Sequence, residues 1–377
     1  MSRTFWIRPD RAFDGQGLRT DVAVAIADGV ITAIGTPPDG AAVEPLAGTL
    51  TPGYLDLQVN GGGGVLLNTD PTAEGMETIA AAHRRFGTVG ILPTLITDAP
   101  EVLDFATEAA LQAWGRKGIL GLHVEGPHIS VQRRGTHAER FIRPLDARTF
   151  NCVARLRAAG VPVMITLAPE AVAPGQIAAL ARMGAVVSIG HSDASADMVR
   201  GALDEGASCF THLFNAMSPL LHRSPGVVGA ALNSRAHAGI ICDGIHVADE
   251  LVGLAIRARP EPDRMFLVSD AMPTVGGPDR FRLYDMDLHL EGGRLVNDEG
   301  SLAGAHVTMA ESVARLVNVV GVDPALALRM ATSIPAAVIG LPDKGQIVGR
   351  PMDEVLVLGA DMSVTGTLDR ILSREAV

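Results

Sequence analysis

The sequence predicts an α/β fold, a (β/α)8 barrel of the TIM type with a small β-sandwich module formed by the N- and C-terminal segments. Three observations support this prediction. From about residue 54, strand-length apolar runs alternate with longer, alanine-rich segments of helical character. Both ends of the chain instead carry short strand-like runs interrupted by Gly, Pro or Asp. Four predicted barrel strands end at a titratable residue, as the strands of barrel enzymes commonly do.

The predicted β-module has an N-terminal part, residues 1–52, and a C-terminal part, residues 344–377. Within 21–52, short Val, Ile and Ala runs are separated by Gly and Pro turns, which is typical of a small antiparallel sheet. The C-terminal part returns to strand-length runs broken by Gly and Asp. Because the two parts share this composition, we expect them to form one module.

The predicted catalytic barrel covers residues 53–343. The segments between its strands are expected to be helices, several of which end at a Gly that can adopt the left-handed cap conformation. Residues 277–300 are predicted to form an inserted hairpin at the edge of the site or at an interface. We expect barrel strands at residues 54–60, 88–96, 119–125, 163–168, 185–191, 208–213, 238–243 and 265–270.

The charge and hydropathy of the chain argue against several functions. Its formal net charge is −11, whereas nucleic acids and anionic membranes usually require a cationic protein face. No run reaches about 18 continuous apolar residues, so no membrane span is expected. A small phosphorylated substrate stays compatible with this charge, because one or two local cations can hold a phosphate.

The cysteines and the N-terminal residues indicate in which cellular compartment the protein works. Cys152, Cys209 and Cys242 are odd in number and widely spaced, which favours reduced, buried thiols over a disulfide framework or a thiolate zinc site. Charged residues such as Arg3 and Arg8 interrupt the place where a signal peptide would need an unbroken apolar stretch. We therefore expect a cytoplasmic protein.

The titratable residues at the strand ends lie in the phrases GLHVEGP, VVSIGHSD, CFTHLFNAM and FLVSDAM. Glu125, His191 and His212 supply one carboxylate and two imidazoles, a ligand set of catalytic zinc sites that leave a position open for water. Each His alone could be a hydrogen-bonded strand-end residue, but the three together predict a metal site. Asp270 could take a proton from an activated water. A helix N-cap is its alternative role, although the Pro and Gly that follow argue against a helix there.

Two amides precede a glycine run near the end of the first barrel strand. Gln58 and Asn60 lie on one face of this strand by its two-residue period, so we expect both to point into the barrel. Amides are weak metal ligands, and they argue for a single ion with hydrogen bonds from Gln58 and Asn60 nearby. A structural polar pair is the alternative. The run Gly61–Gly64 matches no phosphate-binding pattern and is expected to be a flexible βα loop.

Further polar groups gather in loops on the same side of the predicted barrel. Arg223 in LLHRSPG and His246 in CDGIHV could bind a phosphate. Singly, a loop Arg is more often solvated, and a His in such a place more often caps or packs. The other candidates in these loops are Thr136, His137, Asn215 and Ala216.

Several phrases together resemble a known family. PGYLDLQVNGGGG, HVEGPHIS, RRGTH, GHSDAS, THLFNAMSPLLHRSPG, DGIHV and LVSDAM are similar, in order and spacing, to those of the N-acetylglucosamine-6-phosphate deacetylases of the amidohydrolase superfamily. The resemblance implies a barrel with a flanking β-module and a homodimer. It also implies hydrolysis of the acetamido group to give glucosamine 6-phosphate and acetate, a reaction of amino-sugar catabolism and cell-wall recycling.

The resemblance also assigns roles to individual residues. It implies that Glu125, His191 and His212 bind one divalent metal, Zn²⁺ first and Fe²⁺ or another ion as alternatives, and that Asp270 is the catalytic acid and base. With His137 we expect a hydrogen bond to the oxyanion. Arg223 and His246 would reach the sugar phosphate, partly across the dimer. The implied substrate contacts are Thr136, His137, Asn215, Ala216, Arg223, Asp243, His246, Leu302, Ala303 and Gly304.

Some questions stay open at the level of sequence. Gln58 and Asn60 resemble the branch of the family that binds one metal, whereas other members keep two histidines there. His128 departs from the family pattern and could be a weak ligand or line the pocket. Two other functions compete: a barrel amidohydrolase acting on a cyclic amide or an N-acyl amino acid, and a non-catalytic scaffold. Arg223 and the RRGTH phrase argue against the first.

Overall fold

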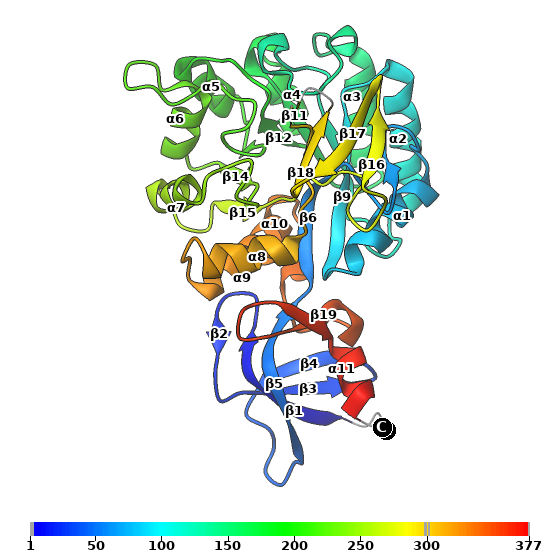
Figure 1. Ribbon diagram of the computed structural model, residues 1–377, viewed down its shortest axis with the longest axis vertical. Coiled ribbons are helices and arrows are strands. Elements are labelled where there is room, and N and C mark those ends of the chain that lie inside the picture. Colours follow the sequence, from blue (N-terminus) through cyan, green and yellow to red (C-terminus); the bar gives the residue numbers. More distant parts are fainter. Residues whose placement is uncertain (1–3, 298–299, 301, 376–377) are drawn as a thin grey trace.

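A computed structural model describes residues 4–297, 300 and 302–375. Figure 1 shows a barrel of strands and helices stacked on a smaller β-module, with the two parts arranged along the long axis of the molecule. Within the described residues, no helix is long and apolar enough to cross a membrane. The fold class predicted from the sequence is confirmed.

The barrel is an eight-stranded parallel sheet in which neighbours in space are also neighbours in sequence order. The ring closes between its last and first strands, where Asp270 N donates to Gln58 O at 3.0 Å and Asn60 N donates to Ala271 O at 2.9 Å. Each predicted strand has an observed counterpart: β6 (Tyr54–Val59), β9 (Thr88–Ile96), β10 (Leu122–Glu125), β11 (Val163–Leu167), β12 (Val186–Ile189), β13 (Cys209–Phe210), β14 (His237–Ile240) and β15 (Met265–Leu267).

Helices cover the outside of the barrel. They are α1 (Ala73–Arg84), α2 (Pro100–Ala113), α3 (Ala147–Ala158), α4 (Gln176–Arg182), α5 (Ala196–Asp204), α6 (Gly226–Asn233), α7 (Asp249–Ala258), α8 (Met309–Asn318), α9 (Pro324–Ala331) and α10 (Ser333–Val338). Side chains fix several of their starts: Thr72, Asp146 and Ser195 each accept a backbone N–H bond at an N-cap. The helix α8 begins with a capping box of Thr308 and Glu311.

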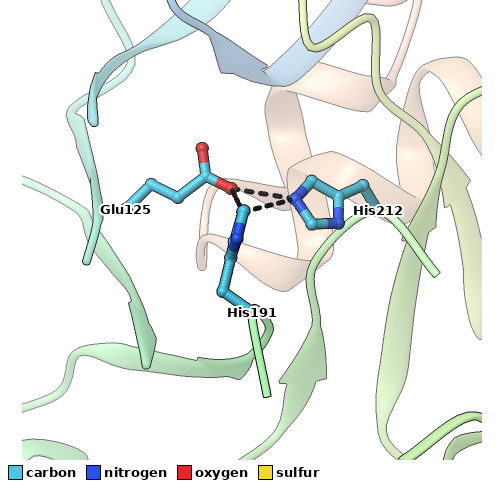
Figure 2. Close-up of side chains that lie close together, drawn as sticks. All are labelled: Glu125, His191 and His212. Atoms are coloured by element: carbon cyan, nitrogen blue, oxygen red, sulfur yellow. Dashed lines mark hydrogen bonds and ion pairs between the residues drawn. The ribbon is translucent and has the colours of Figure 1, made fainter. Parts of the chain in front are cut away.

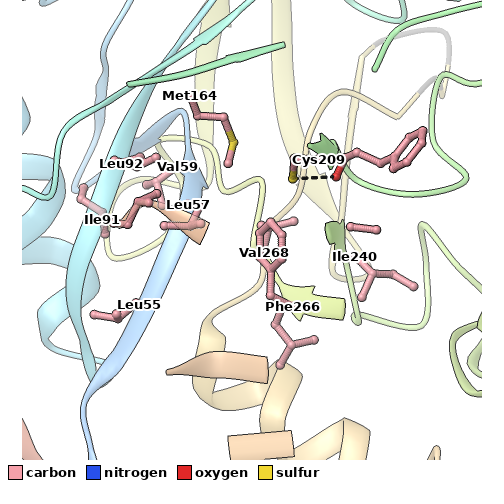
Figure 3. Packing of buried hydrophobic residues seen from close by; sticks show 14 of the residues in the cluster. Leu55, Leu57, Val59, Ile91, Leu92, Met164, Cys209, Ile240, Phe266 and Val268 are labelled. Atoms are coloured by element: carbon pink, nitrogen blue, oxygen red, sulfur yellow. Dashed lines mark hydrogen bonds between the residues drawn. The ribbon is translucent and has the colours of Figure 1, made fainter. Parts of the chain in front are cut away.

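Apolar side chains from these helices and from both faces of the strands form one large core. Figure 3 shows part of it, including Leu57 of β6, Ile91 of β9 and Phe266 of β15. Burial on both faces explains why the strands read as continuous apolar runs in the sequence.

Short 3₁₀ turns lie at η1 (Val131–Arg133), η2 (Glu139–Phe141), η3 (Pro169–Ala171), η4 (Pro342–Gly345) and η5 (Met352–Glu354).

The β-module unites the two ends of the chain in one seven-stranded sheet. Its strands are β1 (Phe5–Phe13), β2 (Leu18–Arg19), β3 (Ala23–Ala27), β4 (Val30–Gly35), β5 (Val43–Pro52), β19 (Val355–Leu358) and β20 (Val364–Thr367). β19 pairs antiparallel with β5, which joins the C-terminal part to the N-terminal part. The helix α11 (Leu368–Glu375) follows β20. The module has its own core, with Ile7, Ile26 and Leu50 fully buried.

The expectation of antiparallel strands within residues 21–52 holds for β3 and β4, and the one parallel pair of the module involves β1, which precedes this segment. β1 pairs parallel with β5, whereas its pairing with β3 is antiparallel. The hairpin β3–β4 lies between β1 and β5 in the sequence, and this length of chain allows the crossover that a parallel pair requires.

The predicted inserted hairpin is a three-stranded antiparallel sheet of β16 (Arg280–Leu283), β17 (Met286–Glu291) and β18 (Arg294–Asn297). Residues 298 and 299 of the predicted segment lie outside the described residues. Leu283, Leu288 and Leu295 form a small core with residues at the barrel mouth. Tyr284 Oη donates a hydrogen bond to Thr97 O, at the end of β9. The insertion therefore lies at the edge of the carboxyl end of the barrel, as Figure 1 also shows.

Candidate active site

Three candidate metal ligands converge at the carboxyl end of the barrel. Glu125 ends β10, His191 follows β12 and His212 follows β13. Glu125 Oε1 lies 3.1 Å from His191 Nε2 and 3.0 Å from His212 Nε2, and the two Nε2 atoms are 3.1 Å apart (Figure 2). Among the described residues, this is the one group of His, Cys, Asp and Glu side chains whose ligand atoms come close enough to hold a metal ion.

The chemistry of these donors fits a divalent cation. His191 Nδ1 lies 2.8 Å from Arg133 O, so this nitrogen carries the ring proton and leaves the Nε2 lone pair directed at the cluster. Burial would lower the pKa of His212, but the Glu125 carboxylate outweighs burial and raises it. Burial would likewise raise the pKa of Glu125, but the adjacent imidazoles of His191 and His212 hold it well below its usual value. The cluster therefore stabilises positive charge at its centre.

The backbone turns sharply where these side chains leave their strands. His191, His212 and Asp270 have φ values of 48°, 31° and 52°. Non-glycine residues rarely adopt this left-handed region, and such strain is concentrated at functional sites. The turns end the strands β12, β13 and β15 and direct the three side chains into the mouth of the barrel.

Asp270 lies beside the cluster, to which Gln58 connects it, and it also accepts a hydrogen bond from Asn60. Gln58 Nε2 lies 3.0 Å from Glu125 Oε1 and 3.1 Å from Asp270 Oδ1. Asn60 Nδ2 donates to Asp270 Oδ1 at 2.7 Å. Burial and the negative charge of Glu125 raise the pKa of Asp270 to about 6. A carboxyl group with a pKa near neutral pH is suited to general acid and base catalysis.

His137 approaches the cluster from the loop after β10. Its ring centroid is 4.3 Å from that of His191. Its Nδ1 accepts a bond from Thr97 N at 3.4 Å and lies 2.7 Å from Thr97 Oγ1. Burial, with the nearby His191, holds the pKa of His137 well below its usual value. The ring is therefore neutral, and because Nδ1 is an acceptor, the proton lies on Nε2.

The glycine run is not the flexible loop that the sequence predicted. Its strand β7 (Gly61–Gly62) pairs with β8 (Val65–Leu66), and all four of these residues are buried or half-buried. Three of its N–H groups donate to the carbonyl oxygens of residues 271, 275 and 273, at 3.0, 2.8 and 2.9 Å. Because these donors are already paired, the loop is ordered and cannot bind a phosphate through them.

The loops that carry Thr136, Asn215 and Ala216 lie against the candidate ligands. Thr136 is half-buried and precedes His137. Asn215 N donates to the His212 carbonyl oxygen at 3.0 Å. Ala216 O accepts a bond from the residue after His191 at 3.1 Å. The two histidine-bearing loops are therefore bonded to each other.

The other predicted substrate contacts occupy different environments. Asp243 Oδ2 lies 2.6 Å from His246 Nδ1, so Asp243 orients that ring. Arg223 is exposed and makes no hydrogen bond or ion pair with the described residues. Leu302 is 39% exposed, whereas Ala303 is buried against the inserted sheet. Gly304 packs on Met272. Ser301, which begins the SLAG phrase, lies outside the described residues.

The sequence left open whether His128 is a weak metal ligand or lines the pocket, and the structure gives it neither role. It is fully buried, with Nδ1 3.0 Å from Arg143 O and Nε2 2.9 Å from Thr149 Oγ1. Both ring nitrogens are therefore occupied by protein partners, and His128 connects the loop after β10 to α3.

Sequence reasoning did not single out several residues that support the site. Arg133 O holds His191, and Thr97 fixes the His137 ring. His123 is fully buried below the cluster. The two-residue period of a strand could have found His123, because it places His123 and Glu125 on the same face. Arg133 lies in the RRGTH phrase, but its residue type does not indicate this role, because the group that it contributes is a backbone carbonyl.

The fold and this site together define a class of protein. A (β/α)8 barrel that carries a Glu–His–His group and an adjacent carboxyl at its strand ends is a metal-dependent hydrolase. This chain belongs to the amidohydrolase family, whose family model matches residues 49–368. The resemblance seen in the sequence is thereby confirmed.

Individual relatives cover most of the chain. It is 40% identical over 344 residues to the N-acetylgalactosamine-6-phosphate deacetylase of Shewanella sp. (strain ANA-3), covering 88% of this chain and 86% of the relative. It is 32% identical over 328 residues to the N-acetylglucosamine-6-phosphate deacetylase of Haemophilus influenzae, covering 85% and 84%. The crystal structure of N-acetylglucosamine-6-phosphate deacetylase from Pasteurella multocida is similar with a TM-score of 0.87 and 32% identity, over 97% of this chain and 98% of that one.

Proposed function

We propose that this chain hydrolyses the acetamido group of N-acetylglucosamine 6-phosphate to glucosamine 6-phosphate and acetate, in amino-sugar catabolism or cell-wall recycling. One observation carries the proposal: Glu125 Oε1, His191 Nε2 and His212 Nε2 converge to about 3 Å beside the Asp270 carboxyl. The names of the relatives supply the substrate class. These relatives, which are 32–40% identical over most of the chain, do not favour the competing function on a cyclic amide or an N-acyl amino acid.

In this proposal Glu125, His191 and His212 hold one divalent ion, Zn²⁺ before Fe²⁺ or another metal. When bound, the ion would polarise the acetyl carbonyl and lower the pKa of a water molecule. Gln58 already donates to Glu125 and Asn60 to Asp270, so these amides orient the two carboxylates rather than bind a second ion.

Asp270 moves the proton in the proposed reaction. Its carboxylate accepts a proton from the attacking water as the new carbon–oxygen bond forms at the acetyl carbon. Asp270 then gives this proton to the sugar nitrogen as the carbon–nitrogen bond breaks, which releases the free amine and acetate. The hydrogen bond from Asn60 Nδ2 at 2.7 Å holds one carboxylate oxygen in place during both steps.

His137 stabilises the charge that develops on the acetyl oxygen. The proton on Nε2, inferred from the bond that Nδ1 accepts from Thr97, makes this nitrogen a donor. A donor aimed at the position of the oxyanion contributes more to the transition state than to the ground state. Because the ring is neutral, it donates a hydrogen bond without competing for the proton carried by Asp270.

The phosphate would be bound by two basic side chains. His246, oriented by Asp243, and Arg223 are the proposed phosphate contacts. Arg223 is exposed within its own chain, which fits a contribution to the neighbouring site of a homodimer. The remaining proposed substrate contacts are Thr136, Asn215, Ala216, Leu302, Ala303 and Gly304.

A second candidate substrate is N-acetylgalactosamine 6-phosphate. The relative at 40% identity is named for this sugar, whereas the Haemophilus enzyme at 32% is named for the glucosamine compound. The two sugars differ in configuration at a single hydroxyl-bearing carbon. Both place the acetamido and phosphate groups at the same positions, so one catalytic centre can serve either.

Acetate release from purified protein tests both candidates. Each 6-phosphate would be supplied to the zinc-loaded protein, with unphosphorylated N-acetylglucosamine as the control, and kcat/KM compared. The expected result is release from at least one phosphorylated sugar and a much lower kcat/KM for the control. Absence of release from both phosphorylated sugars by a protein that contains stoichiometric metal would overturn the proposal and leave the scaffold alternative.

A further inference from the structure

A chain of hydrogen-bonded side chains crosses the barrel interior just below the candidate metal ligands. His123 lies between Thr94 Oγ1 at 3.2 Å and Thr166 Oγ1 at 2.7 Å. Thr211 Oγ1 then lies 2.6 Å from both Thr166 Oγ1 and Ser188 Oγ. None of these five side chains is more than 4% exposed. Interiors of such barrels are usually filled by branched apolar residues, so a continuous polar layer requires an explanation.

The polar layer connects the strands that deliver the ligands. Three of its members stand one to three positions before a candidate ligand: Thr211 before His212, His123 before Glu125, and Ser188 before His191. The layer also packs directly beneath the backbone that leads to His191. A Cβ at Gly190 would lie 2.9 Å from Thr211 Cβ and 2.8 Å from Thr166 Cγ2.

The two histidines of the cluster are held in different ways. The outer nitrogen of His191, Nδ1, lies 2.8 Å from Arg133 O, which fixes the orientation of the ring. The corresponding Nδ1 of His212 is buried and has no hydrogen-bond partner on another of the described residues. Metal-binding histidines usually donate this N–H to a partner that orients the ring. The placement of His212 therefore depends on its backbone, which is strained at a φ of 31°.

We infer that the Thr211 hydroxyl is the positioning group for His212 and thereby sets the affinity of this centre for a divalent cation. Thr211 is bonded on its side chain to two other strands and on its backbone N–H to Ile189 O at 3.0 Å. These bonds connect the residue next to His212 to β11 and β12. They take the place of the missing partner of the His212 ring. The inference rests on the metal centre of the proposed function.

Zinc titration of the metal-free protein tests the role of this hydroxyl. Thr211→Val removes the hydroxyl while keeping volume and branching, so His212 should lose its fixed position. Loss of such a supporting partner typically weakens metal binding by about ten- to a hundredfold. Thr211→Ser keeps the hydroxyl and should bind Zn²⁺ with nearly the wild-type Kd.

Thr88→Val is the matched control. Thr88 is a buried threonine at the start of β9, and its Oγ1 has no hydrogen-bond partner among the described residues. This variant also replaces a threonine hydroxyl by a methyl group, but at the amino end of a barrel strand, away from the candidate ligands. Its Kd for Zn²⁺ should equal that of the wild type. The melting temperature of each metal-free protein, recorded alongside, separates a loss of stability from a loss of affinity.

Two outcomes would overturn the inference. One is a Kd for Thr211→Val within twofold of the wild type, even with a lower melting temperature, because the hydroxyl would then be only structural. The other is a Thr211→Ser protein as weak as Thr211→Val. Should Thr211→Val fail to fold, Ser188→Ala removes one of the two bonds to Thr211 and is judged by the same criterion. A wild-type protein that binds no Zn²⁺, Fe²⁺ or other divalent ion would instead reject the metal centre itself.

Discussion

The barrel mouth and the outer loops of the proposed site are held in different ways. Glu125, His191 and His212 are at most 5% exposed, and every one has a hydrogen-bond partner on another strand or loop. Arg223 is exposed and unpaired within the described residues, and Leu302 is 39% exposed. The comparison indicates that the fold pre-organises the groups for bond breaking. Of the two proposed phosphate contacts, His246 is already oriented by Asp243, and we expect Arg223 to become fixed only when substrate or a second subunit is present.

The largest effect is expected from removing the metal. Dialysis of the protein against a chelator should reduce acetate release to background, and stoichiometric Zn²⁺ should restore it, because in the proposed reaction the ion activates the water and polarises the acetyl carbonyl. Metal content by elemental analysis and acetate release should fall and recover together. Full activity in metal-free protein would show that the pre-organised cluster is not the reactive centre.

Replacement of the proposed base should have the next largest effect. Asp270→Asn keeps the shape of the side chain but cannot accept a proton, so kcat should fall by about two to four orders of magnitude. Metal content should stay near wild type, because Asp270 is not among the proposed ligands. Asp279→Asn, at an exposed position near the inserted sheet, is the matched control and should be fully active. Normal turnover in Asp270→Asn would remove this residue from the mechanism.

The outer loops should affect binding rather than turnover. Arg223→Ala should raise KM for the phosphorylated sugar by about tenfold, the effect of losing one charged hydrogen bond to phosphate, with little change in kcat. KM for the unphosphorylated sugar should not change. Arg200→Ala removes an exposed arginine that pairs with Asp197 on α5 and serves as the control. An equal KM for wild type and Arg223→Ala would reject the phosphate contact. It would also reject the idea that the barrel mouth carries out catalysis while the outer loops bind the phosphate.

The contrast between the barrel mouth and the loops also explains how much of the fold and site the sequence could predict. The barrel strands and the residues at their ends were predictable, because a buried parallel strand leaves a continuous apolar run and its last residue points to the mouth. Contacts made by backbone atoms, such as that of Arg133 O with His191, leave no trace in residue type. The role of His128 and the order of the glycine run depended on partners far away in the sequence, which periodicity cannot reveal. The parallel pairing of β1 with β5 was missed for the same reason.

The smallest expected effect is a displacement of the profile of kcat/KM against pH. It tests whether the surroundings of Asp270 at the barrel mouth set the pKa of this carboxyl. Burial and Glu125 raise the pKa of Asp270 to about 6, and only its carboxylate can accept a proton, so activity should rise with pH and level off above this value. A bound cation favours the carboxylate, which places the midpoint of the acidic limb of kcat/KM at or below pH ~6.

Asn60→Ala sharpens this test because Asn60 Nδ2 donates to Asp270 Oδ1 at 2.7 Å and thereby stabilises the charged form. Without this bond the neutral form gains relative stability, so the acidic limb should move to higher pH, by about one unit for a charged hydrogen bond of ordinary strength. Asn233→Ala, which removes an exposed amide that donates to Gly229 O on α6, should leave the limb in place. A limb that moves downward in Asn60→Ala, or that is absent from the wild type between pH 4 and pH ~6, would mean that a group other than Asp270 accepts the proton.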